Sequence, residues 1–109
     1  MGQTYVELKN TQESIYSFLK ADKISPKNPI VLFHLGKSYR DVGDYKKEIK
    51  CYEKAVKIFP EFKNALIELG KAYAKKEKYK KAKNILKKAQ NLDPENTEIE
   101  NLINKYEKY

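Results

Sequence analysis

The chain has no tryptophan, only one cysteine, one histidine and one arginine, and only four glycines and four prolines. A single cysteine cannot form an internal disulfide, so nothing in the sequence points to an oxidising compartment. So few glycines and prolines argue against an all-β chain, which needs many tight turns. No hydrophobic run approaches the roughly 18 residues of a membrane-spanning helix. We therefore expect no membrane span and, by default, a cytoplasmic location.

The scarcity of histidine and cysteine also restricts the catalytic and metal sites that the chain can form. The single histidine, His34, and the single cysteine, Cys51, are too few for a metal cluster. They could meet only across a helix pair, and Cys51 is better interpreted as a buried structural thiol than as a nucleophile. Neither a glycine-rich phosphate loop nor a Ser-His-Asp arrangement can be assembled from the sequence. We expect a protein that is not an enzyme, with no catalytic residues, no cofactor and no metal.

Charge is distributed unevenly along a chain whose net charge is +8. Residues 71–88 contain nine lysines and one acidic residue, whereas residues 89–109 contain two lysines and five acidic residues. The near absence of arginine disfavours specific nucleic-acid recognition, which relies on bidentate arginine contacts. Two interpretations of the lysine-rich stretch remain open. It is either a solvated helix face or a docking site for an acidic protein, an anionic membrane surface or RNA.

Three stretches of the chain resemble one another at a spacing of 34 residues. They are Gly2-Gln3-Thr4-Tyr5, Gly36-Lys37-Ser38-Tyr39 and Gly70-Lys71-Ala72-Tyr73. The same spacing separates Pro26, Pro60 and Pro94. Self-similarity at a fixed period is the signature of stacked repeats. We expect a single domain made of a partial repeat at 1–28, full repeats at 29–62 and 63–96, and a capping helix at 97–109.

Apolar residues within each copy follow the helical period. Leu32, Leu35 and Tyr39 recur at intervals of three and four residues, as the buried face of an amphipathic helix does. This spacing therefore predicts two amphipathic helices in each copy. The breaks between them are expected at 42–44 in the middle copy and near 77–78 in the next.

Three helix starts are predicted from capping signals. Asn28 precedes Pro29, which is the combination of an N-cap with proline in the first turn. Asn10 with Glu13, and Thr97 with Glu100, have the spacing of a capping box. We therefore expect the second helix of the partial repeat to begin at Asn10 and the last helix to begin at Thr97.

Small residues inside the predicted helices indicate close packing. Gly36 and Gly70 lie where glycine costs about 1 kcal/mol relative to alanine. That cost is explained if a neighbouring helix approaches the backbone closely, and Ala55 and Ala89 fit the same interpretation. Glu48 occupies a position of this small-residue type. We expect its carboxylate to escape to solvent.

The combined pattern resembles the tetratricopeptide repeat, whose unit runs aromatic-x2-Leu-Gly-x2-Tyr, then Ala-x3-Phe, then Ala and Pro. The resemblance covers essentially the whole chain, with departures at Leu32, Glu48, Leu66 and Leu86. It implies an all-α, right-handed solenoid of antiparallel helix pairs with a C-terminal capping helix. It also implies a non-catalytic scaffold that binds a peptide or helical segment of a partner protein in a concave groove lined by the first helix of each pair.

The candidate groove residues lie on the first helices, at positions that the repeat motif does not use for packing. They are Gln3, Val6, Ile30, Phe33, His34, Lys37, Arg40, Asp41, Asn64, Ile67, Glu68, Lys71 and Lys75. Phe33 and Ile67 share one repeat offset and either line the groove or extend the core between repeats. With lysines beside them, this face favours a segment that has hydrophobic anchors and acidic flanks.

One subclass of the family grips the C-terminal carboxylate of heat-shock chaperones with asparagine or arginine on successive first helices. This chain has His34 and Glu68 at those positions, and Glu68 would repel a carboxylate. The sequence therefore does not predict a co-chaperone of that kind. We interpret His34 as a polar residue that lines the groove rather than as a metal ligand or pH switch.

Two further functions follow from the charge and from the first copy. The lysine-rich stretch could make the chain a basic module that binds nucleic acid or another polyanion. The first copy begins at its glycine, which indicates either a fragment of a longer array or an end that is partly uncovered. An uncovered end would leave Ile15, Phe18 and Leu19 available to a second copy, so self-association is a third function to consider.

Overall fold

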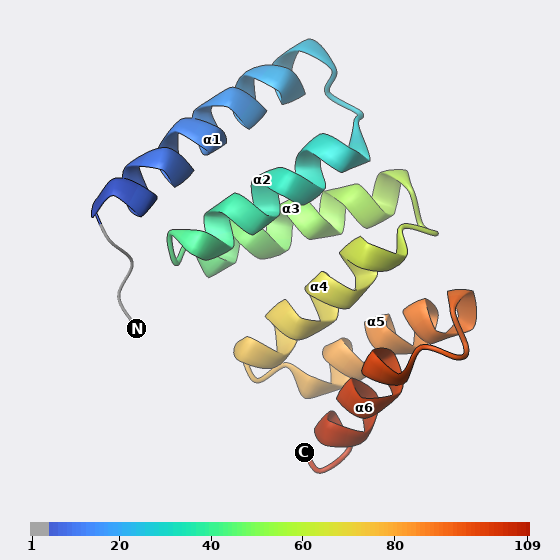
Figure 1. Cartoon of the computed structure of the whole chain (residues 1–109). Coiled ribbons are helices and arrows are strands. Elements are labelled where there is room, and N and C mark those ends of the chain that lie inside the picture. The colour runs from blue at the N-terminus through green and yellow to red at the C-terminus, as the bar shows by residue number, and fades with distance from the viewer. Residues whose placement is uncertain (1–4) are drawn as a thin grey trace. The chain divides into compact units, whose positions relative to one another are not determined.

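The computed structural model describes residues 5–109, with side chains from Asn10 onward, and divides at Ile58–Phe59 into two compact units. The first unit contains α1 (Tyr5–Ile24), α2 (Pro29–Asp41) and α3 (Tyr45–Ile58) (Figure 1). The second contains α4 (Lys63–Lys75), α5 (Tyr79–Leu92) and α6 (Thr97–Tyr106). The described residues form helices and no strand, which confirms the all-α class. None of these helices combines the length and the apolar character needed to cross a bilayer.

In the first unit α2 packs against both α1 and α3. The predicted N-cap is confirmed, since Asn28 Oδ1 accepts hydrogen bonds from the Ile30 N–H (3.0 Å) and the Val31 N–H (3.3 Å). The predicted break at 42–44 is also confirmed. There the chain reverses through Gly43, whose φ of 81° is a left-handed conformation that glycine adopts readily.

The helix start predicted at Asn10 is wrong. α1 is continuous from Tyr5 to Ile24, and Asn10 lies inside it, where its backbone oxygen accepts a hydrogen bond from Ser14 Oγ (3.1 Å). The preceding residues, 6–9, contain neither glycine nor proline, so nothing ends the helix before Asn10. The described part of the first copy is therefore one long helix rather than a helix pair.

Close packing at the helical glycines is confirmed. A Cβ atom on Gly36 would lie 2.6 Å from Cε1 of Tyr52, a residue of α3 that is completely buried. A Cβ atom on Gly70 would lie 2.7 Å from Cγ of Leu86, which is completely buried on α5. The glycine of α2 therefore accommodates a large side chain of α3, and the glycine of α4 accommodates one of α5.

The expectation that Glu48 escapes to solvent is wrong, because its exposed fraction is 1%. Glu48 lies one turn before Tyr52, and Tyr52 is followed by Ala55 on the same face of α3. Both of these residues are fully buried, so the rotation of α3 points position 48 into the unit as well. Glu48 is also in the first turn of α3, where the partial positive charge of a helix N-terminus favours a carboxylate.

In the second unit α5 packs against α4 and α6. The break predicted near 77–78 is confirmed, and so is a terminal helix with a buried stripe that includes Ile99, Ile103 and Tyr106. Its predicted start at Thr97 is confirmed, but the capping residue is the one before it. The N-cap is Asn96, whose Oδ1 accepts a hydrogen bond from the Ile99 N–H (3.1 Å).

Hydrogen bonds to the Asp93 carboxylate join the beginning of α6 to the beginning of α4. Asp93 Oδ2 accepts hydrogen bonds from Asn96 Nδ2 and from Lys63 Nζ, both at 3.1 Å. These two hydrogen bonds, that from Asn96 first, lower the pKa of Asp93. The capping residue of α6 is thus held by a carboxylate that also binds α4, and this orients α6 within the unit.

The contact at Gly36 generates a prediction about stability. Alanine normally stabilises a helix relative to glycine, but here its methyl group would displace the buried Tyr52 ring. We expect Gly36→Ala to lower the free energy of unfolding by about 1–3 kcal/mol, measured by urea denaturation. Asn84→Ala, at an exposed position of α5, is the control and should raise it by a few tenths of a kcal/mol. A Gly36→Ala protein as stable as the parent chain would contradict the packing argument.

The turn between α4 and α5 generates a second prediction. Glu77 has a φ of 60° and occupies the repeat offset of Gly43, so the same left-handed turn is made there by a residue with a side chain. We expect Glu77→Gly to raise the free energy of unfolding by about 1 kcal/mol. Glu77→Gln removes the same charge without relieving the backbone. An equal effect of the two substitutions would show that the gain comes from charge.

Candidate functional site

The predicted groove residues of α2 form a mixed surface on the first unit. Ile30 is 59% exposed, and His34 and Asp41 are also exposed, whereas Lys37 and Arg40 are half-buried. The Arg40 guanidinium approaches the Asp41 carboxylate, with Nε 3.7 Å from Oδ1. This face therefore offers one large exposed apolar side chain together with charges of both signs.

Phe33 and His34 are held in a chain of aromatic contacts. The Phe33 ring is 9% exposed and packs against Tyr52 of α3, with ring centroids 5.9 Å apart. Lys37 Nζ covers another part of it, 5.4 Å from the ring centroid. His34 stacks on Phe18 of α1 at 5.8 Å and 14°. Phe33 thus has the burial of a core residue, and His34 contacts the preceding helix.

Some of the predicted groove residues on α4 are buried or ion-paired. Ile67 is 7% exposed, so it too has the burial of a core residue, whereas Asn64 and Lys75 are exposed. Lys71 Nζ lies 2.9 Å from Oε1 of Glu98 on α6 and 3.8 Å from Oε1 of Glu68. The hydrogen bond to Glu98 is the largest cause of a raised pKa at Lys71, so this ammonium stays charged at neutral pH.

The remaining predicted groove residues lie outside the described side chains. Gln3 precedes the described chain, and only the backbone of Val6 is described, within α1. The groove as a whole stays a prediction, because its residues on α2 and on α4 belong to different units.

The lysine-rich stretch covers the end of α4, the turn that follows and α5, as expected. Lys80, Lys87 and Lys88 are exposed on α5. Lys83 Nζ lies 4.0 Å from Oε2 of Glu107, and this contact joins the lysine-rich stretch to the acidic C-terminal stretch. The pair Lys71–Glu98 does the same.

Sequence reasoning missed two contacts, that of Glu98 with Lys71 and that of Phe18 with His34. Glu98 belongs to α6, which was assigned only a capping role, and it holds Lys71. Phe18 belongs to α1 and holds the ring of His34. The opposite charges of residues 71–88 and 89–109 were the one available signal for Glu98, whereas no local pattern pairs Phe18 with His34.

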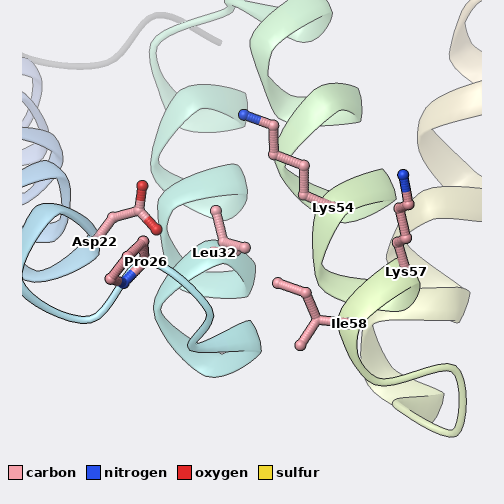
Figure 2. A pocket seen from close by; sticks show the side chains of 6 residues that line it. All are labelled: Asp22, Pro26, Leu32, Lys54, Lys57 and Ile58. Carbon is pink, nitrogen blue, oxygen red and sulfur yellow. The ribbon is translucent and has the colours of Figure 1, made fainter.

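A small pocket of about 140 Å³ lies where the three helices of the first unit meet (Figure 2). Asp22 of α1 and Leu32 of α2 face Ile58 of α3 across it, and the other lining residues are Pro26, Lys54 and Lys57. Asp22 Oδ1 is buried and makes no hydrogen bond. The charged residues of the lining are this one carboxylate and two lysines.

Cys51 is buried on α3, as predicted. Burial is the largest cause of its raised pKa of about 11, and the negative charges of Asp22 and Asp44 add to it. A reactive cysteine has a lowered pKa, because the thiolate is the nucleophile. The thiol of Cys51 is therefore protonated at neutral pH and has the character of a structural side chain.

Comparison with known proteins gives a consistent result. A family profile described as tetratricopeptide repeat matches residues 41–106, and a second profile with the same description matches residues 1–28. No curated protein sequence matches the chain significantly.

Solved structures of similar fold carry the same kind of domain. The first TPR of Spaghetti (RPAP3), bound to the HSP90 peptide SRMEEVD, is 21% identical, with a TM-score of 0.86 over 95% of this chain and 82% of that one. The Sgt2 TPR domain from Aspergillus fumigatus is 24% identical, with a TM-score of 0.82 over 92% of this chain and 68% of that one. The Arabidopsis OM64 TPR domain is 18% identical, with a TM-score of 0.84 over 92% and 83%. These similarities confirm the helical-repeat fold.

Proposed function

This chain belongs to the tetratricopeptide repeat family, and we propose that it is a non-catalytic module that binds a segment of a partner protein through exposed residues of α2 in the first unit and of α4 in the second. The observation that supports this proposal most directly is the exposure of Ile30. It is 59% exposed on α2, within a turn of helix from Phe33 and two turns from Lys37. A large exposed apolar side chain near cationic ones suits a partner with a hydrophobic anchor beside acidic residues.

The partner in this proposal differs from the peptide bound by the Spaghetti domain. Glu68 is half-buried on α4, with Oε1 3.8 Å from Lys71 Nζ, and Lys71 is also engaged by Glu98. A carboxylate of the partner placed beside Glu68 would therefore meet a negative charge first. The proposed partner is an internal segment that places its apolar anchor on α2, rather than a C-terminal carboxylate.

Selection from a library of displayed random peptides tests this function directly. We expect recovered peptides to share an apolar residue flanked by acids, and Ile30→Asp to weaken their binding about tenfold. Lys87→Glu changes an exposed lysine of α5 instead and should leave affinity within about twofold. Failure to recover peptides that depend on Ile30 would contradict the proposal.

Ionic strength separates this mode from binding to a polyanion through the α5 lysines. Groove recognition with an apolar anchor should persist from about 50 to about 200 mM salt, whereas binding through several phosphate contacts loses orders of magnitude. The same titration with single-stranded RNA as ligand serves as the comparison.

Self-association is a second candidate, and the surface of α1 favours it. Tyr16 is 60% exposed, Leu19 45% and Ile24 82%, whereas Ile15 and Phe18 are only half-exposed. A helix with exposed apolar side chains of this size is a candidate contact between copies.

Sedimentation equilibrium over a wide concentration range tests self-association. If α1 joins two copies, the parent chain should show a concentration-dependent mass, and Leu19→Lys should remove it because burying an unpaired ammonium is unfavourable. Ser17→Lys, at an exposed polar position, is the control. Phe18→Lys is less suitable because Phe18 stacks on His34. A parent chain that stays monomeric would rule this candidate out.

A further inference from the structure

We propose that a pocket between α4, α5 and α6 in the second unit binds a glutamate or aspartate side chain of the partner segment, an inference that rests on the proposed function. The pocket has a volume of about 220 Å³. Its lining residues are Lys71, Ala74, Lys75, Tyr79, Lys105, Tyr106 and Tyr109. Lys71 and Lys75 are predicted groove residues, whereas α6 and the residues after it supply a side of the pocket that the repeat motif does not predict.

One wall of the pocket is a group of tyrosine rings. The rings of Tyr79 and Tyr109 stack with centroids 4.0 Å apart and an angle of 11°. Tyr106 is 7% exposed, and its ring lies 5.9 Å from that of Tyr79. Since Tyr79 and Tyr109 stack on each other, these two rings together do not form an open slot for a base. With Ala74 they form an apolar surface on which the methylene groups of an acidic side chain can lie.

The charges around the pocket favour an anion. Three lysines line it and no acidic residue does. Glu68 and Glu98 partly neutralise Lys71 from outside the pocket. Lys105 forms no ion pair with any described residue, and it lies with Lys75 in the last turns of α6 and α4. An acidic side chain that enters the pocket therefore meets ammonium groups from two helices.

The chemistry of the lysines indicates a carboxylate ligand on a flexible side chain. Lysine is a point charge on a mobile stem and does not impose the planar, bidentate geometry that arginine gives. An acidic side chain joins an apolar stem to a charged head, which matches an apolar wall with lysines at the rim. Because Lys71 and Lys75 also belong to the exposed face of α4, the residue bound here would be an acidic flank of the segment bound by the proposed groove.

Titration of the whole ¹⁵N-labelled chain with a hexaglutamate peptide tests the pocket. At about 50 mM salt, we expect amide shifts to concentrate at Ala74, Tyr79, Lys105 and Tyr106. Hexaglutamine is the uncharged probe and should produce none of them. Shifts spread evenly along the lysines of α5, or the absence of shifts at the pocket, would overturn the proposal.

A pair of double variants separates the pocket from general attraction to a basic protein. Lys75→Gln with Lys105→Gln should weaken hexaglutamate binding about tenfold. Lys87→Gln with Lys88→Gln removes the same charge from exposed positions of α5 and should weaken binding less than about threefold. Equal losses in the two variants would overturn the proposal. All four positions are charged surface residues, so both variants should fold, which their amide spectra will verify.

The results also distinguish this inference from the proposed function. If selected peptides depend on Ile30 but hexaglutamate binding does not depend on Lys75 and Lys105, the proposal about the pocket fails and the proposed function stands. If hexaglutamate binds at the pocket but no displayed peptide depends on Ile30, the pocket stands as a carboxylate site and the proposed function fails.

Discussion

The distance between the two helices of each pair depends on the absence of a side chain at one position. Gly36 lets the Tyr52 ring lie against the α2 backbone, and Gly70 does the same for Leu86 on α4. Those two side chains are completely buried, and so are Ala55 and Ala89 one turn further along their helices. The rotation of each second helix follows from these contacts, because only one face can bring such residues against the first helix.

The same packing determines which side chains remain exposed and so available to a partner protein. Once Tyr52 fills the space beside Gly36, its ring also contacts Phe33, and Phe33 becomes part of the buried interior. Ile30, almost one turn earlier on α2, has no such neighbour and is 59% exposed. The apolar character of this face is thus concentrated at one end of α2. On α4 the corresponding face is mainly charged, and its lysines meet acidic residues of α6.

The periodic features could be predicted from the sequence because they depend on local chemistry. The breaks near 42–44 and 77–78 and the Asn28 cap each follow from residues a few positions apart, and the repeat spacing is visible directly as similar residues 34 positions apart. The start at Asn10 failed because capping-box spacing also occurs within a continuous helix when nothing interrupts it. Thr97 and Asn96 are both good caps, and the hydrogen bond from Asn96 to Asp93 favours Asn96.

Apart from the start at Asn10, the features that were wrongly predicted or missed depend on how helices pack against one another. Glu48 was assigned to solvent from its polarity, but the rotation of α3 places it inside. The contact of Glu98 with Lys71 joins residues of different helices, and so does that of Phe18 with His34. The lysine and tyrosine pocket likewise depends on how α6 lies against α4 and α5, which the repeat motif does not encode.

The unequal side chains opposite the two glycines have a consequence for assembly of the chain. Helices built on one repeat pattern can mispair, because each first helix could accept the wrong second helix while the chain collapses. Exchanging α3 and α5 would place the Tyr52 ring against Gly70, in a space occupied by Leu86, and Leu86 against Gly36, in a space occupied by the larger ring. The exchange would also bring the Glu48 carboxylate to the place of Ala82, which is completely buried. The departures from strict repetition therefore distinguish the native pairing from its alternatives.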